Sequence, residues 1–208
     1  MAKPDLWPTI HAERNALAAD LESLTDAQWT TSSLCGEWSV REVLGHMTAT
    51  AAMTPPSFFS NLIGSGFRFS AMQAKAVAKQ NEGTPDDTLG RFKAQVDATT
   101  HPPGPIDSWL GETIVHAEDI RRPLGIAHTY PVNDVTRIAA FYRGSNLLIG
   151  GKRRAAGLTL RAADADWSAG SGPEVSGPAI SLVLAITGRP EALDDLAGEG
   201  LAALKQRM

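Results

Sequence analysis

Apolar residues recur at helical spacing through most of the chain, and this pattern constrains the fold more than any other feature. Between Pro8 and Leu24 they stand at Ile10, Leu17 and Leu21 with charged residues between them, which predicts an amphipathic helix. Comparable spacing predicts further helices over residues 67–81, 84–99, 106–122 and 132–148. The chain is therefore expected to be mainly α-helical.

Another helix begins with a clear start signal. Ser39-Val40-Arg41-Glu42 fits a capping box, in which the serine hydroxyl and the glutamate carboxylate bond to the first free backbone N–H groups. Pro55-Pro56 must interrupt this helix or follow it closely, because proline has no N–H donor and crowds the residue before it. The predicted helix contains His46.

The most aromatic stretch of the chain runs from Phe58 to Phe69 and is broken by Gly64 and Gly66. We interpret it as a pocket wall or a lid. Packing in the core is the alternative, because an aromatic run at helical spacing is more often a core element.

The character of the sequence changes at Gly150-Gly151. Strand-like segments are predicted at 158–162 and 174–177, with a turn-rich loop from Asp164 to Gly172 between them and helices over 178–187 and 191–206 after them. We therefore expect a helical domain over residues 1–150 and a small α+β domain over residues 151–208.

Composition narrows the function. The 208 residues include 19 Lys and Arg against 23 Asp and Glu, and the net charge of −4 disfavours nucleic-acid binding. A single cysteine and the lack of an apolar leader favour a cytoplasmic protein, and no apolar run is long enough to cross a membrane. A chain of this size builds a core without metal, so a bound metal would be functional.

One group of residues has the side chains and the spacing of a metal site. Glu112 and His116 are four residues apart on a predicted helix and therefore face the same side of it. With His46 from the other helix they would form a three-ligand metal site with an open position. The alternative is two buried histidines bonded to backbone or carboxylate groups. In the metal site, either Glu118 or Asp119 would accept a hydrogen bond from a ligand histidine.

Several segments resemble those of a known family. LCGEWSVREVLGH, from Leu34 to His46, resembles the Cys-x-x-Trp-x-x-x-x-x-x-x-His signature of the mycothiol-dependent maleylpyruvate isomerase family, a branch of the DinB-like superfamily. GETIVHAEDI, from Gly111 to Ile120, is similar to the family's Glu-x-x-x-His-x-x-Asp segment. The segments at 164–167, 172–173, 175–179 and 187–190 resemble the small C-terminal domain of many members.

The resemblance implies a DinB-like four-helix bundle with a small C-terminal α/β domain. It implies a divalent metal, usually zinc, held by His46, Glu112 and His116, with mycothiol or a similar low-molecular-weight thiol at the open position. Arg189 stands at the family's Gly-Arg position and would contact a substrate carboxylate or the thiol cofactor. Alternatively, Arg189 is a positive charge that caps the C-terminal end of a helix next to Gly188.

Two functions remain open at this point. The first is a metal- and thiol-dependent enzyme, a cis-trans isomerase or an S-transferase acting on a small electrophile. The second is a non-catalytic DinB-like protein that binds a metal or ligand, and either could be a monomer or a homodimer. Cys35 is expected to be a small packing residue and Trp38 a loop anchor, while His11, His101 and His128 are expected at the surface.

Overall fold

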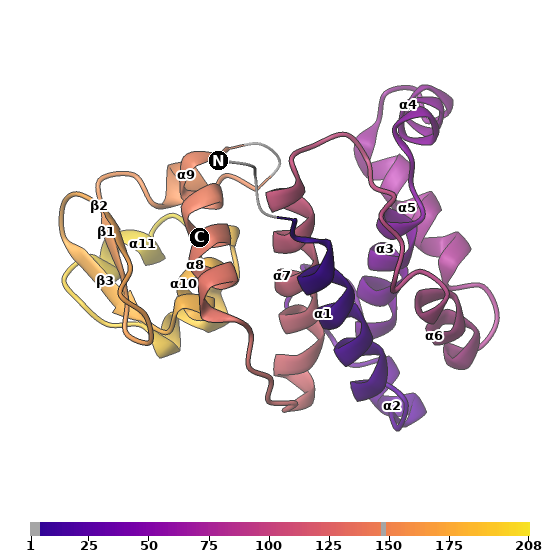
Figure 1. Ribbon diagram of the computed structural model, residues 1–208, viewed down its shortest axis with the longest axis horizontal. Helices are drawn as coiled ribbons and strands as arrows, with labels where there is room; N and C mark the ends of the chain where they lie inside the picture. The colour runs from indigo at the N-terminus through magenta and orange to yellow at the C-terminus, as the bar shows by residue number, and fades with distance from the viewer. Residues whose placement is uncertain (1–4, 147–148) are drawn as a thin grey trace. The chain divides into compact units, whose positions relative to one another are not determined.

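The computed structural model describes residues 5–146 and 149–208 and divides into two compact units, Met1–His128 and Thr129–Met208 (Figure 1). The first unit is helical, and the second combines helices with a three-stranded sheet. This confirms the predicted mainly α fold with a small α/β part. None of the described helices is long and apolar enough to pass through a membrane.

Four helices of the first unit surround one core, in which Leu17, Leu44, Phe92 and Ile120 are fully buried. Each of these four side chains comes from a different helix, so α1, α3, α6 and α7 form a bundle around this core, and α5 packs against α3. The helices of this unit are α1 (Trp7–Asp20), α2 (Asp26–Trp29), α3 (Val40–Ala51), α4 (Pro55–Gly64), α5 (Phe69–Gln80), α6 (Pro85–Lys93) and α7 (Ile106–Leu124).

The two helices that matter most for the site have well-defined ends. At the start of α3, Glu42 Oε2 accepts a hydrogen bond from Ser39 N at 2.8 Å, and Ser39 Oγ accepts one from Glu42 N at 3.3 Å, which confirms the predicted capping box. Helix α7 runs past the expected stop at Arg122 and ends before Gly125. Gly125 has φ of 69°, a left-handed conformation that glycine adopts without a Cβ penalty.

The aromatic stretch lies at the surface. No residue of α4 is buried, and Phe59, Ile63 and Phe67 are 54%, 62% and 74% exposed. Packing in the core is therefore wrong for these side chains. Thr54 caps α4 and Pro55 and Pro56 occupy its first turn, so the prolines start a new helix after α3 has ended.

The second unit is built around α10 (Ala179–Thr187), which is apolar on all sides and is buried from Ser181 to Thr187. The sheet has the order β2-β1-β3, with β1 antiparallel to β2 and parallel to β3. Two strands match the prediction, whereas β2 lies in the segment expected to be a loop. The remaining elements are α8 (Val132–Gly144), α9 (Gly151–Arg154), β1 (Thr159–Ala162), β2 (Ser168–Gly170), β3 (Glu174–Gly177), η1 (Pro190–Asp195) and α11 (Leu201–Lys205).

The predicted single helix over 191–206 is wrong. The chain forms the 3₁₀ helix η1, bridges Ala197 to Ser176, and then forms α11. Gly198, with φ of 115°, lies against the backbone carbonyl of Glu174, and a Cβ on Gly200 would come within 2.7 Å of the carbonyl oxygen of Pro173. The glycines allow this close backbone approach, which a continuous helix would not make.

The units divide between His128 and Thr129, whereas the sequence suggested a boundary near Gly150. The reason is that α8 packs against α10 in the second unit and buries Val135, Ile138, Ala139 and Tyr142. Helix α8 ends at Gly144, and the predicted extension to Leu148 reaches residues outside the described ones. That the units fold independently stays a prediction.

Candidate metal site

The structure brings together the three residues that were predicted to hold a metal. Helix α3 supplies His46, and α7 supplies Glu112 and His116, with one ligand atom of each within 4.8 Å of the others. His46 Nε2 lies 3.9 Å from Glu112 Oε1, and these two side chains are 14% and 11% exposed. The rings of His46 and His116 meet edge to face with centroids 4.9 Å apart. The site is thus small and largely buried.

Packing of the bundle explains this convergence. Helices α3 and α7 contact each other and share the core through Val43, Leu44, Ala117 and Ile120. The ligand side chains lie beside these apolar positions, so burial of the core carries the polar groups inward as well.

The donor atoms fit a divalent cation. Glu112 Oε1 is buried and has no hydrogen-bond partner in the part of the chain that the structure describes. Its distance of 3.9 Å from His46 Nε2 is too long for a hydrogen bond. It is close to the spacing of about 3.3 Å between ligands of a tetrahedral zinc ion with bonds of about 2.0–2.1 Å. A shared cation would satisfy the carboxylate oxygen that the protein leaves unpaired.

Burial also acts on the protonation of Glu112. Desolvation raises the pKa of this carboxyl, against opposing effects of His116, of Arg14 and of a hydrogen bond with Thr50. Arg14 on α1 is itself buried and donates a hydrogen bond from Nη1 to the carbonyl oxygen of Ala98 at 3.0 Å. Sequence reasoning missed Arg14 and Thr50, because no motif connects them to the site.

A carboxylate on the same helix contacts the imidazole ring of His116. Its Nδ1 lies 2.8 Å from Asp119 Oδ2, and Asp119 is fully buried. This contact occupies Nδ1 and leaves Nε2 as the nitrogen for a metal, as in many carboxylate–histidine–zinc sites. The sequence had left Glu118 and Asp119 as equal candidates. Glu118 instead accepts a hydrogen bond from Arg122 Nε at 2.8 Å.

The two histidines differ in protonation. Burial, helped by the nearby His116, lowers the pKa of His46 to about 3, so its imidazole is neutral and able to bind a metal. Burial by itself would lower the pKa of His116 too, but hydrogen bonds with Asp119 and Cys35 outweigh it and raise the pKa to about 10. The Trp38 ring packs against His46 with a centroid distance of 5.1 Å.

Cys35 does more than the packing role expected for it. It does pack against the core of the bundle, where it is half-buried. Its sulfur also forms a second cluster with His116 and Asp119, with ligand atoms within 4.8 Å of one another. The sequence could not indicate this contact, because His116 is far from Cys35 along the chain and only the packing of α7 brings it close.

Arg189 lies in the second unit and is buried. Its Nη1 donates a hydrogen bond to the carbonyl oxygen of Thr187 at 2.9 Å, just after the end of α10. This contact agrees with the interpretation of Arg189 as a charge that follows the end of a helix. A role toward substrate or thiol stays a prediction.

The other histidines, expected at the surface, are half-buried. His128 Nε2 lies 2.7 Å from Glu13 Oε2, and the ring of His101 contacts that of Trp109 at a centroid distance of 5.6 Å. His11 has a buried Nε2. None of them belongs to the cluster of His46, Glu112 and His116.

Comparison with known proteins finds a relative of the first unit. Residues 10–103 match the family model of the mycothiol maleylpyruvate isomerase N-terminal domain. This part of the chain is therefore similar to that domain. The match confirms the resemblance seen in the sequence, and it contains His46 but ends before Glu112 and His116.

Two crystal structures share the fold of nearly the whole chain. One is the mycothiol-dependent maleylpyruvate isomerase, with a TM-score of 0.63, and the other is a histidine-to-alanine mutant of that isomerase, with a TM-score of 0.62. Each is 15% identical in sequence, and each alignment covers 93% of this chain and 91% of the other. No curated protein sequence matches the chain. The protein is thus maleylpyruvate isomerase-like in fold.

Proposed function

We propose that this protein is a metal- and thiol-dependent enzyme that acts on a small electrophile, as a cis-trans isomerase or an S-transferase. The observation that carries the proposal is the unpaired, buried Glu112 Oε1, which faces the imidazoles of His46 and His116. A buried carboxylate oxygen without a partner is costly, and a cation held by all three side chains would remove that cost.

The chain's own residues would prepare the site. The ring nitrogens of His46 and His116 and the carboxylate of Glu112 would hold a divalent ion, which we propose to be zinc. When bound, such an ion supplies a Lewis acid that favours the thiolate form of a low-molecular-weight thiol at neutral pH. Asp119 fixes the ring orientation of His116, and the Trp38 ring limits the movement of His46.

A thiolate supports two outcomes. Its addition to a conjugated double bond leaves a single bond, which can rotate before the thiolate is eliminated, so that a cis substrate becomes trans. Attack on an electrophilic carbon without elimination gives a thiol conjugate instead. We propose Arg189 as the residue that contacts a substrate carboxylate or the thiol, because guanidinium binds carboxylates through two parallel hydrogen bonds.

The family match and the shared fold support a thiol as the co-substrate, since both solved structures are of a mycothiol-dependent isomerase. We also propose that the protein works in the cytoplasm, where thiols are kept reduced. The alternative is a non-catalytic protein that binds zinc or another ligand at the same three residues.

Kinetics of the zinc-loaded protein test the proposal. Mycothiol is offered with a panel of small electrophiles that includes maleylpyruvate, and both thiol consumption and cis-trans conversion are followed. Turnover should need zinc and thiol together, and Glu112→Gln should abolish it. Glu118→Gln, an acid-to-amide change on the same helix outside the ligand cluster, should retain it.

Two results would contradict the proposal. Turnover of an electrophile with no thiol present would mean that water is the nucleophile. Zinc binding without turnover, for every thiol and electrophile tested, would favour the non-catalytic alternative.

A further inference from the structure

An apolar stripe lies exposed along α4 and the turn that follows it. It consists of Phe59, Ile63 and Phe67, which follow one another at intervals of four residues, the spacing of neighbours on one side of a helix. All three side chains are more than half exposed, and no residue of α4 is buried. Helix α4 thus lies on the surface of the first unit (Figure 1). Exposed apolar surface of this kind marks a site of contact with a protein or a membrane.

Backbone hydrogen bonds hold the last member of the stripe in place. At the end of α4, Gly66 N donates to the carbonyl oxygen of Ile63 and Phe67 N donates to that of Leu62, both at 2.9 Å, which is the pattern of a Schellman motif. Phe67 has φ of 60° and is the only residue besides glycines with a positive φ in the described part of the chain. A bulky side chain adopts this left-handed conformation only at a cost in free energy. The turn therefore fixes an aromatic ring that the protein leaves mostly in water.

The segment that carries the stripe differs in charge from the rest of the chain. From Val43 to Asn81 the sequence contains three Lys or Arg residues, Arg68, Lys75 and Lys79, and no Asp or Glu. The other 16 Lys and Arg residues stand against all 23 Asp and Glu residues. All three cationic side chains of the segment are exposed. An acidic protein thus has one long stretch that is purely cationic.

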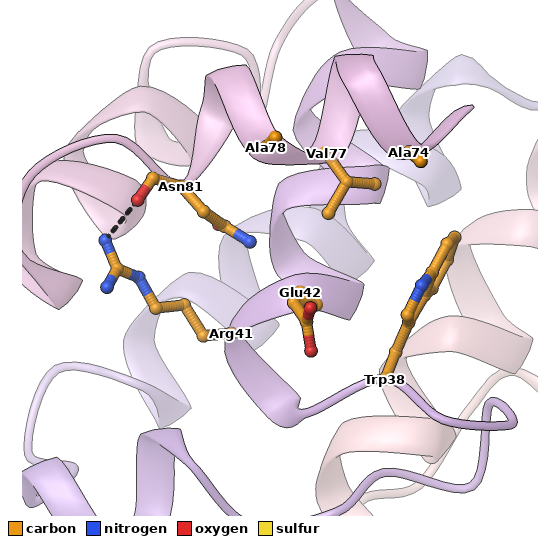
Figure 2. A pocket seen from close by; sticks show the side chains of 7 residues that line it. All are labelled: Trp38, Arg41, Glu42, Ala74, Val77, Ala78 and Asn81. Atoms are coloured by element: carbon orange, nitrogen blue, oxygen red, sulfur yellow. Dashed lines mark hydrogen bonds between the residues drawn. The ribbon is translucent and has the colours of Figure 1, made fainter. Parts of the chain in front are cut away.

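The lysines of this stretch face away from the bundle. Val77 of α5 is buried and turns toward the cavity between α5 and the start of α3 (Figure 2). Lys75 and Lys79 lie two residues before and after Val77, so their side chains leave α5 on the opposite side. Helix α4 packs against α5, and Arg68 directly follows Phe67. The positive charges therefore lie next to the apolar stripe and remain accessible.

We propose that the apolar stripe and these three cations bind the surface of a membrane that contains anionic lipid. The apolar side chains would enter the boundary between headgroups and acyl chains, and the cations would attract the lipid phosphates. Interfacial helices share this combination of an apolar side with Lys and Arg beside it. Helix α4 has 10 residues and would lie on the bilayer without crossing it.

The charge favours a membrane over a second copy of the chain as the occupant. Two stripes that met in a symmetric dimer would bring Arg68, Lys75 and Lys79 of both copies close together, and like charges repel. An anionic lipid surface is complementary to the same charges. Projecting side chains also need no matching groove in a bilayer, because the lipid chains adapt to them.

Sedimentation of the full-length protein with vesicles tests the proposal. One kind of vesicle contains equal parts of phosphatidylcholine and phosphatidylglycerol, and the other contains phosphatidylcholine alone. Half of the protein should bind the anionic vesicles at on the order of 1 mM lipid, as expected for a weak and reversible anchor. Each cation near an anionic surface contributes about fivefold in affinity, so binding to phosphatidylcholine should be at least about tenfold weaker. High salt should weaken binding to the anionic vesicles in the same direction.

Variants separate the stripe from the charges. Phe59→Ser together with Ile63→Ser should weaken binding to the anionic vesicles by at least about tenfold, because the apolar area that enters the lipid is lost. Lys75→Gln together with Lys79→Gln should weaken binding to the anionic vesicles by about 10- to 30-fold and leave binding to phosphatidylcholine unchanged. All four side chains are exposed, so both variants should keep the fold, which circular dichroism checks.

Matched changes in the second unit serve as controls. Met208→Ser removes another exposed apolar side chain. Lys152→Gln together with Lys205→Gln removes two other exposed lysines. Both control proteins should bind the two kinds of vesicle as the wild type does.

Three results would overturn the proposal. The first is the absence of binding up to about 10 mM anionic lipid. The second is equal binding by the wild type and by Phe59→Ser with Ile63→Ser. The third is a wild-type dimer, seen by sedimentation equilibrium, that the same two changes convert to a monomer, since this would assign the stripe to an interface between copies.

Discussion

At the residue scale, the pKa values of the two histidines of the candidate site are shifted in opposite directions. His46 is kept neutral by burial, whereas Asp119 and Cys35 stabilise the cationic form of His116 and raise its pKa to about 10. A metal ligand must offer a free lone pair, so the proton of His116 has to leave when a cation binds. A proton and the metal ion thus compete for one nitrogen of His116.

This competition predicts proton release. At pH 7, below the raised pKa of His116, zinc binding should release at least about one proton per ion, and the zinc affinity should rise with pH. Isothermal titration calorimetry in buffers of different ionisation enthalpy measures the number of protons. Zinc binding with no proton release would contradict the protonation states described for the site.

Asp119 predicts a second effect at this scale. Asp119→Asn removes the anionic partner of His116 and should lower the zinc affinity by about 10- to 100-fold while leaving the fold intact. Competition with a chelator of known affinity measures the change. Glu118→Gln is the matched control, because Glu118 pairs with Arg122 instead. Equal zinc affinities of the two variants would show that Asp119 does not support the site.

At the scale of elements, the helices of the first unit fall into two kinds. The bundle helices bury one face, and α6 contributes the fully buried Phe92. Helix α4 buries no residue and shows Phe59 and Ile63 to solvent. The stability of the unit should therefore come from the bundle helices, with little contributed by α4.

The same substitution in the two helices tests this difference. Phe92→Ala should lower the free energy of unfolding by about 3–5 kcal/mol, because it leaves a cavity in the core. Phe59→Ala should change it by no more than about 0.5 kcal/mol. Urea denaturation of the full-length protein measures both. A loss of similar size for Phe59→Ala would mean that α4 is packed more tightly than its exposure indicates.

The sequence predicts elements well where their signals are local. The capping box at Ser39 sets the start of α3, and Pro85 sets that of α6, so both helices could be located without the fold. Strand β2 and the break at Gly198 depend on contacts with β1 and Glu174, which no local pattern records. The three candidate ligands were predicted by spacing and motif, whereas Cys35 and Arg14 join the site only through packing.

At the scale of the whole molecule, the chain consists of two units that meet in sequence at His128 and Thr129. The glycines at 150 and 151 suggested a later boundary, because they break the helical pattern more visibly than the segment around His128 does. Helix α8 lies between the two boundaries in sequence, and its apolar face packs on α10.

Two truncated proteins distinguish these boundaries. A protein of residues 1–128 should be helical and unfold cooperatively, because it contains the whole core of the bundle. A protein of residues 1–150 should bind more of a hydrophobic dye, because Val135, Ile138 and Tyr142 lose their cover. Circular dichroism melts and dye fluorescence report both properties. A cooperative transition in the longer protein alone would favour the boundary near 150.

A metal held by His46, Glu112 and His116 is the basis of the proposed chemistry, and the metal content of the purified protein tests whether it is there. After incubation with zinc and removal of the excess, elemental analysis should find about one zinc ion per chain. The double variant His46→Ala, His116→Ala should retain none, while His128→Ala, which removes a histidine paired with Glu13 outside the site, should retain it fully. Full zinc content in the double variant would contradict the account.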